Sequence, residues 1–284
     1  MIVDSHQHFW DPEQVYYDWL VPAYGPIYRA FEPAELEPKL AAAGVERTVL
    51  VQAACNFEDT EAMLAQAAEH EWIGGVVGWV PLYAHRLAER ALDRYGANRW
   101  FKGVRHLNHE EADPDWLVRP EVIDGLKILE ERQLAYDVIA VWPLHLGHVP
   151  ALAGACPDLR MVIDHLAKPP IASGEYAGWK DALTAAAEFP NVYAKISGLN
   201  TAAEWETWTA ADLVEPIGYA LEVFGAQRLM FGSDWPVAIH AGDSAKVWSE
   251  TNRALDELRV QGVERAAILG DTAADFYRIE APAA

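Results

Sequence analysis

The stretch Ile2-Val3-Asp4-Ser5-His6-Gln7-His8-Phe9 decides the fold prediction, because it has the pattern of a β-strand with two histidines near its end. Successive side chains of a strand alternate between its faces, so His6 and His8 point the same way. Two imidazoles on one face can hold a metal ion or polarise a carbonyl group. A second apolar run, residues 228–236, carries the carboxylate of Asp234. The pairing predicts one site where the first and last strands of a barrel meet.

Neither motif is specific by itself. A His-x-His pair also occurs at exposed and structural positions, and a Gly-Ser-Asp sequence is more often a turn or a helix N-cap than a catalytic group. The functional interpretation gains weight because polar residues end several other apolar runs of this chain in the same manner.

Strand-like apolar runs alternate with helical patterns along the whole chain. The predicted strands cover residues 2–8, 47–53, 73–80, 100–106, 134–140, 160–165, 191–197 and 227–233. The predicted helices cover residues 33–43, 58–70, 84–95, 120–132, 144–155, 175–188, 210–224 and 243–260, and residues 262–277 add helical turns that close the barrel. This order is typical of an α/β fold, the (β/α)8 TIM barrel. An open doubly wound sheet would normally show a Gly-rich turn after its first strand, where this chain has aromatic residues and Pro12.

The length fits one barrel, because a TIM barrel needs about 250 residues and this chain has 284. Hydrophobic residues make up 51%, which is ample for a core, and no linker or internal repeat interrupts the pattern. We therefore predict a single domain over residues 1–284. The two cysteines, Cys55 and Cys156, form no spacing motif and are expected to be reduced thiols.

The charge excludes several classes of partner. The chain has 22 Lys and Arg against 43 Asp and Glu, a net charge of −21, whereas nucleic acids and anionic membranes require basic patches. No run reaches the roughly 20 apolar residues of a membrane span, and a strand that starts at residue 2 leaves no room for a signal peptide. We expect a cytoplasmic protein, monomer or homodimer, that acts on a small molecule.

The first connection, residues 9–32, is unusually long and rich in aromatic side chains. These are Phe9, Trp10, Tyr16, Tyr17, Trp19, Tyr24, Tyr28 and Phe31. A loop of this length is usually functional or disordered, and so many aromatic rings argue against disorder. The loop either packs as a cover over the barrel mouth or walls a substrate pocket, and the two interpretations are compatible.

Active sites of such barrels lie at the carboxyl ends of the strands. The polar or aromatic residues found there are His6, His8, Gln52, Trp79, Arg105, His106, Tyr136, Asp137, Asp164, His165, Lys195, Ser197 and Asp234, with Lys168 just beyond the sixth strand. The remaining histidines, His70, His85, His109, His145, His148 and His240, fall on predicted helices or outer loops, and we expect them at the surface or at helix ends.

Five short motifs carry a family resemblance. They are Val3-Asp4-Ser5-His6-Gln7-His8-Phe9-Trp10, Gly103-Val104-Arg105-His106, Val162-Ile163-Asp164-His165-Leu166-Ala167-Lys168-Pro169, Lys195-Ile196-Ser197-Gly198 and Met230-Phe231-Gly232-Ser233-Asp234-Trp235-Pro236. With these motifs the chain resembles the amidohydrolase superfamily, of the amidohydrolase-2 type, and within it the sugar lactonases such as L-fuconolactonase and L-rhamnonolactonase. The resemblance implies a TIM barrel of the amidohydrolase type whose central site is His6, His8, His165 and Asp234.

The resemblance also limits the metal content. Binuclear amidohydrolases bridge two metal ions with a carboxylated Lys or a Glu after the fourth strand and add a His after the fifth. Here the fourth strand ends in Arg105 and His106, Lys102 comes too early, and the fifth ends near residues 138–140. Two expectations stay open: no strictly required cofactor, or one divalent metal ion, zinc first, held by the four central residues.

The chemistry implied is hydrolysis of a lactone, which needs an activated water and a stabilised oxyanion. Asp234 is the expected base, and the three histidines polarise the carbonyl as hydrogen-bond donors or through a metal ion. The expected substrate contacts are Arg105, His106, Trp10 and Lys195. For Arg105 the alternative is an ion pair with an acid at the rim, and for Lys195 it is a buried ion pair.

Three functions remain in view. The first is a hydrolase that opens a sugar-acid lactone, such as L-fucono- or L-rhamnono-lactone, to the open-chain acid. The second is a metal-dependent decarboxylase of the same superfamily, which is disfavoured because the rim is poor in Arg. The third is a non-enzymatic binding protein, disfavoured because nothing structural requires the four central residues together, and a fold alone does not define a function.

Overall fold

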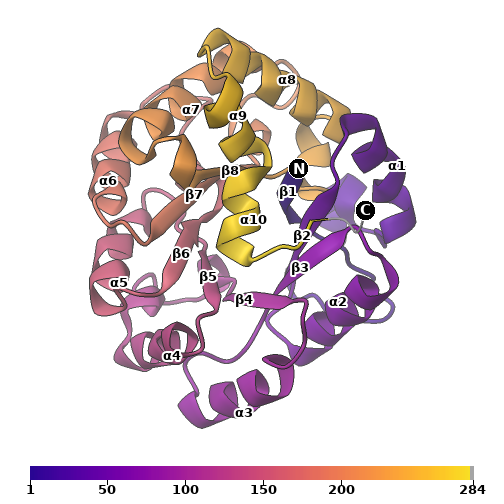
Figure 1. Ribbon diagram of the computed structural model, residues 1–284, viewed down its shortest axis with the longest axis vertical. Helices are drawn as coiled ribbons and strands as arrows, with labels where there is room; N and C mark the ends of the chain where they lie inside the picture. The colour runs from indigo at the N-terminus through magenta and orange to yellow at the C-terminus, as the bar shows by residue number, and fades with distance from the viewer. Residues whose placement is uncertain (282–284) are drawn as a thin grey trace.

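Eight parallel strands lie side by side in chain order and form the inner wall of a barrel in the computed structural model, which describes residues 1–281 (Figure 1). The strands are β1 (Val3–Gln7), β2 (Arg47–Val51), β3 (Ile73–Gly78), β4 (Phe101–Arg105), β5 (Ala135–Val138), β6 (Arg160–Ile163), β7 (Val192–Ile196) and β8 (Leu229–Phe231). Each pairs in parallel with the next. The predicted TIM barrel is confirmed.

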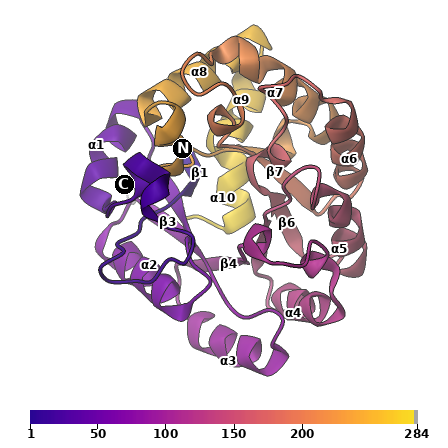
Figure 2. The same ribbon diagram turned by 180° about the vertical axis from the view of Figure 1, so that it is seen from behind.

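The helices form a ring outside the strands (Figures 1 and 2). They are α1 (Pro33–Ala43), α2 (Phe57–Glu69), α3 (His85–Tyr95), α4 (Pro120–Glu131), α5 (Val149–Ala155), α6 (Ala177–Ala187), α7 (Ala210–Phe224) and α8 (Ser244–Glu257), followed by α9 (Gly262–Ala266) and α10 (Thr272–Tyr277). The main departure from the prediction is α5, which is shorter because its first turn is a 3-10 turn, Leu146–His148. No helix within residues 1–281 combines the length and apolar character needed to cross a membrane.

The tail covers the amino-terminal end of the barrel. In Figure 1 the yellow helix α10 crosses the front of the strands, and in Figure 2 it lies behind them. Its side chains Phe276 and Tyr277 pack against a buried group inside the barrel that includes Val3, Val49 and Met230. The predicted helical turns at residues 262–277 are therefore present, and they leave the carboxyl ends of the strands as the open face.

The barrel closes between β1 and the segment that follows β8. The backbone N–H of Asp234 donates to the carbonyl of His6 at 2.8 Å, and the N–H of His8 donates to the carbonyl of Trp235 at 2.7 Å. The buried carboxylate of Asp4 joins the same seam by accepting from the N–H of Ser233 at 2.8 Å. The predicted meeting of the first and last strands is thus made by the residues that carry the candidate site.

Candidate active site

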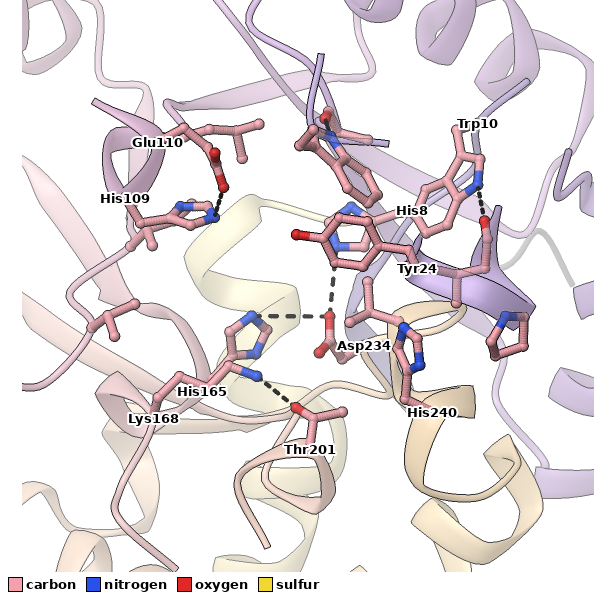
Figure 3. A pocket seen from close by; sticks show the side chains of 18 of the residues that line it. His8, Trp10, Tyr24, His109, Glu110, His165, Lys168, Thr201, Asp234 and His240 are labelled. Atoms are coloured by element: carbon pink, nitrogen blue, oxygen red, sulfur yellow. Dashed lines mark hydrogen bonds and ion pairs between the residues drawn. The ribbon is translucent and has the colours of Figure 1, made fainter. Parts of the chain in front are cut away.

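A cavity of about 640 Å³ opens at the carboxyl ends of the strands. Figure 3 shows side chains that line it. Trp10, Trp19 and Tyr24 line it from the long connection after β1, so this loop both packs over the barrel and walls the cavity. The indole N–H of Trp10 donates to the carbonyl of Arg29 at 2.8 Å, and that of Trp19 donates to the carbonyl of Ala53 at 2.6 Å. Both rings are therefore held in fixed orientations.

The carboxylate of Asp234 lies at the cavity floor among three histidines. Its Oδ1 is 3.6 Å from His8 Nε2, 3.8 Å from His6 Nε2 and 3.9 Å from His165 Nε2. Figure 3 shows Asp234 between His8 and His165. Its other oxygen, Oδ2, is buried and has no hydrogen-bond partner among the described residues. The four residues that the sequence singled out therefore converge around Asp234 Oδ1, while Oδ2 is enclosed by the protein.

The backbone that presents these groups is unusual. Asp234 has φ 56°, and the four residues from His165 to Lys168 all have φ between 48° and 62°. Left-handed backbone costs a residue other than Gly roughly 1 kcal/mol or more, and such strain clusters at functional sites. The left-handed turn brings the side chains of both His165 and Lys168 to the cavity.

A glycine makes room for the cluster. Gly198, after β7, has φ 55°, and a Cβ added there would lie 2.4 Å from Asp234 Oδ2 and 2.8 Å from His165 Nδ1. Both distances are shorter than real Cβ atoms show. Position 198 therefore requires a glycine for two reasons: its backbone has a positive φ, and a Cβ would not fit beside the carboxylate.

Burial and charge set the protonation states of the cluster. Burial lowers the pKa of His6, of His8 and of His165, the last to about 4. Burial alone would raise the pKa of Asp234, but the neighbouring rings of His165 and His8 and the Lys168 ammonium outweigh it and hold that pKa below its ordinary value. At neutral pH the site therefore contains neutral imidazoles and an ionised carboxylate.

Arg105 lines the cavity, but its hydrogen bonds hold it in the wall. Nη1 forms an ion pair with Asp164 Oδ2 at 3.0 Å, Nε donates to Gln52 Oε1 at 3.0 Å, and Nη2 donates to the Gln52 carbonyl. The alternative of an ion pair with an acid at the rim is therefore realised. Only the guanidinium protons left over by these bonds can reach a ligand.

The structure corrects the substrate contact expected of His106. Strand side chains alternate, so the residue after the inward Arg105 faces the other way. Its ring stacks on Trp116 with centroids 3.9 Å apart, accepts from Trp79 Nε1 at 3.0 Å and donates to Glu111. His106 is not among the cavity-lining residues of the described chain, and it supports the wall from behind.

The structure also corrects the substrate contact expected of Lys195. It points into the barrel but lies below the mouth, fully buried, with its ammonium paired to Asp137 and, at 3.1 Å, to Asp164. The hydroxyl of Tyr277, on α10, donates to the same Asp137 carboxylate at 2.8 Å. The alternative of a buried ion pair is therefore correct. Within residues 1–281, Lys195 is not a lining residue of the cavity.

Two histidines expected at the surface or at helix ends also line the cavity. His109 follows β4 in a 3-10 turn (Asn108–Glu110), and His240 lies in a 3-10 turn after β8 (Val237–Ala241). Both belong to loops at the carboxyl ends of strands, and this place in the sequence is the only pattern that indicates a position near the cavity. Lys168 is the third addition: its ammonium donates to Thr201 Oγ1 at 2.7 Å and to the Gly198 carbonyl at 3.2 Å.

The central residues are spaced like the ligands of a single metal ion. The atoms His6 Nε2, His8 Nε2 and Asp234 Oδ1 form a triangle with sides of 3.0, 3.6 and 3.8 Å. Ligands about 2.1 Å from a tetrahedral zinc ion are about 3.4 Å apart. The donor set and the spacing therefore fit one divalent cation.

Comparisons with known proteins agree with this geometry. The sequence profile of the amidohydrolase family matches residues 3–279. An L-fucono-1,5-lactonase from Burkholderia ambifaria is 39% identical over 99% of this chain and 96% of its own length. An L-fucono-1,5-lactonase from Burkholderia multivorans is 35% identical over 99% of this chain and 97% of its own length.

Two solved structures of an amidohydrolase from Burkholderia multivorans have nearly the same fold. The one with bound HEPES is 34% identical and the one with bound zinc is 33% identical. Each superposes with a TM-score of 0.91 and covers 99% of this chain and 100% of the other. The similarity therefore extends over the whole barrel.

Proposed function

This chain belongs to the amidohydrolase family, and we propose that it hydrolyses a sugar-acid lactone, of the L-fucono-1,5-lactone kind, to the open-chain acid. The whole chain acts as one catalytic domain in this proposal. The full-length similarity to the two curated lactonases supports the substrate class, and the residues at the cavity floor support the chemistry.

One observation carries the proposal: a carboxylate beside three histidines lies at the floor of a cavity with apolar walls. Asp234 Oδ1 lies within 3.9 Å of Nε2 of His6, His8 and His165, whereas Oδ2 is enclosed beside Gly198. A water held at Oδ1 would face whatever carbonyl the cavity presents to it. The rings of Trp10, Trp19 and Tyr24 offer flat apolar surface to the C–H faces of a sugar ring.

The proposed reaction proceeds in two steps. In the first step, Asp234 accepts a proton from water while the water oxygen attacks the carbonyl carbon of the lactone. That carbon becomes tetrahedral, and the former carbonyl oxygen carries the negative charge. In the second, the bond from that carbon to the ring oxygen breaks, and Asp234 returns the proton to the leaving alkoxide. The product is a hydroxy acid, which releases one proton to solution at neutral pH.

Lys168 is the group best suited to stabilise the oxyanion. An ammonium has three protons, and the two acceptors named for Lys168, Thr201 Oγ1 and the Gly198 carbonyl, engage two of them. The third is available to a ligand, because the side chain lines the cavity. A charge-assisted donor fixed in advance by its neighbours is the kind of group that stabilises a developing oxyanion.

A metal ion is not strictly required in this proposal. A single zinc ion would be held by His6, His8 and Asp234, with His165 beside it, and when bound it would supply Lewis-acid polarisation of the carbonyl and of the attacking water. The chain's own residues already provide a base and a cationic donor, and a lactone carbonyl needs less activation than an amide.

The test is proton release from a panel of aldonolactones, including L-fucono- and L-rhamnono-lactone, with and without a chelator. We expect catalysed release from at least one sugar lactone in both conditions. Asp234→Asn protein provides the control for spontaneous ring opening. Carbon dioxide release from a hydroxybenzoate, without lactone hydrolysis, would favour a decarboxylase instead. Size-exclusion chromatography of the same preparation tests the expectation of a monomer or homodimer.

A further inference from the structure

A chain of polar contacts leads from the barrel interior to the histidine pair beside the cavity. The ammonium of Lys195 faces three groups: the Asp137 carboxylate, Asp164 Oδ1 at 3.1 Å and His6 Nδ1 at 3.0 Å. An ammonium has three protons and no lone pair. Its contact with His6 is therefore a hydrogen bond only if Nδ1 is unprotonated, which places the proton of a neutral imidazole on Nε2.

A separate contact requires the same tautomer of His6. His8 Nδ1 is 2.7 Å from the carbonyl oxygen of Val51. Because a carbonyl oxygen only accepts, Nδ1 carries the proton of His8 and its Nε2 has a lone pair. His6 Nε2 lies 3.0 Å from His8 Nε2. One of these two nitrogens must donate at that distance, and only His6 has a proton to give.

Two longer contacts favour the other tautomer, but in each case the group that makes the contact also forms a shorter ion pair. Arg105 Nη1 is 3.4 Å from His6 Nε2, yet it pairs with Asp164 Oδ2 at 3.0 Å. Asp164 Oδ1 is 3.3 Å from His6 Nδ1, yet it lies closer, at 3.1 Å, to Lys195. Hydrogen bonds weaken as these lengths grow, so the two 3.0 Å contacts decide the proton's place.

We propose that Lys195 is a positioning residue that holds His6 as its Nε2–H tautomer and so disfavours metal binding at the His6–His8 pair. A metal ion binds the unprotonated nitrogen of an imidazole. His6 Nε2, which belongs to the candidate metal site, carries the proton. The proton cannot move to Nδ1, because Nδ1 accepts the hydrogen bond from Lys195. Lys195, which the sequence suggested as a substrate contact, thus acts through His6, whichever lactone the cavity accepts.

The first test is the tautomer itself. In wild-type protein labelled with ¹⁵N histidine, a long-range ¹H–¹⁵N correlation spectrum distinguishes protonated from bare ring nitrogens, and a His6→Asn variant identifies the His6 signals. We expect His6 protonated on Nε2 and bare on Nδ1. A neutral His6 protonated on Nδ1 would overturn the proposal without any further variant.

The second test removes the lysine while keeping the buried charges balanced. In Lys195→Met/Asp137→Asn, one positive and one negative charge are lost together, and Asp164 Oδ1 becomes free to accept from His6 Nδ1. We expect the tautomer to reverse and the zinc affinity, measured by competition with a chromophoric chelator, to rise about 10- to 100-fold.

The matched control is Tyr277→Phe, which removes the hydroxyl that donates to Asp137 but leaves Lys195 in place. Its tautomer and zinc affinity should stay close to wild type. Zinc affinity that is unchanged after the tautomer reverses, or that rises equally in the control, contradicts the assignment. Neither readout uses lactone turnover, so a failed lactonase assay and a failed tautomer assignment are distinguishable.

Discussion

Replacing Asp234 by Asn should abolish most of the activity and leave the fold intact. Position 234 has φ 56°, a conformation that Asn tolerates better than most residues other than glycine. The backbone N–H of residue 234 still donates to His6, so the seam between β1 and β8 keeps that hydrogen bond. The substitution therefore changes one atom's chemistry with little change in shape.

The size of the effect follows from the loss of the carboxylate at the cavity floor. Oδ1 lies within 3.9 Å of Nε2 of all three histidines, whereas Oδ2 is enclosed beside Gly198. In the Asp234→Asn variant either the oxygen or the NH₂ group of an amide takes the Oδ1 place, where water must lose its proton. An amide cannot accept that proton. Loss of a general base costs about 10² to 10⁴ in rate, or about 3–5 kcal/mol in the activation barrier.

The assay is kcat/KM for proton release from the preferred lactone, with the thermal midpoint measured on the same samples. The matched control is Asp93→Asn, an exposed aspartate paired with Arg132 on the outer surface, which should keep wild-type activity. A folded Asp234→Asn protein with more than about a tenth of wild-type kcat/KM would refute the role of Asp234 as the base, because a lost general base costs at least about 10².

Three further predictions follow from the same site. Gly198→Ala should lower kcat/KM at least about 100-fold, because the added Cβ overlaps Asp234 Oδ2. The control Gly262→Ala has the same φ of 55° but open space around it, so it should lose stability and keep its activity. Equal kcat/KM values for the two variants would contradict this prediction. Lys168→Met should lower kcat about 10² with a smaller change in KM if its third proton meets the oxyanion, and steady-state kinetics showing a rise in KM alone would assign it to ground-state binding. Burial lowers the pKa of His165 from 6.5 to about 4, so as the pH falls the unfolded chain takes up this proton before the folded chain does. The contribution of His165 to the free energy of unfolding is therefore complete above about pH 6.5 and is lost as the pH falls to about 4, a loss of about 3 kcal/mol. Urea denaturation at pH 4.5 and 7.5 should show this loss in wild type and a clearly smaller one in His165→Asn.

The periodic part of the fold could be predicted from the sequence. Strand and helix positions agree to within a few residues for most elements, because buried parallel strands and amphipathic helices leave different hydrophobic periods. The four central residues were also within reach, since each ends a strand or follows it directly. Their convergence needed only the rule that all strand ends of a parallel barrel meet on one face.

The failures have three physical causes. His106 ends a strand, which places it near the cavity, but the alternation of side chains sends it to the opposite face from Arg105. Lys195 faces inward as expected, yet the depth of a residue within the barrel depends on the stagger between strands, which a single sequence does not reveal. His109 and His240 depend on the path of irregular loops, where no periodic pattern exists to guide a prediction.

The seam that closes the barrel and the group that does the chemistry are one structure. The hydrogen bonds from Asp234 to His6 and from His8 to Trp235 join residues more than 220 positions apart, and the Asp4 carboxylate adds a third link to Ser233. Ordering the ends of so long a segment is entropically costly, and Asp234 adds the strain of a left-handed backbone. The links offset these costs only when the barrel is fully closed. Asp234, His6 and His8 therefore reach their places only when the barrel closes, and a partly open barrel would lack the site as a whole.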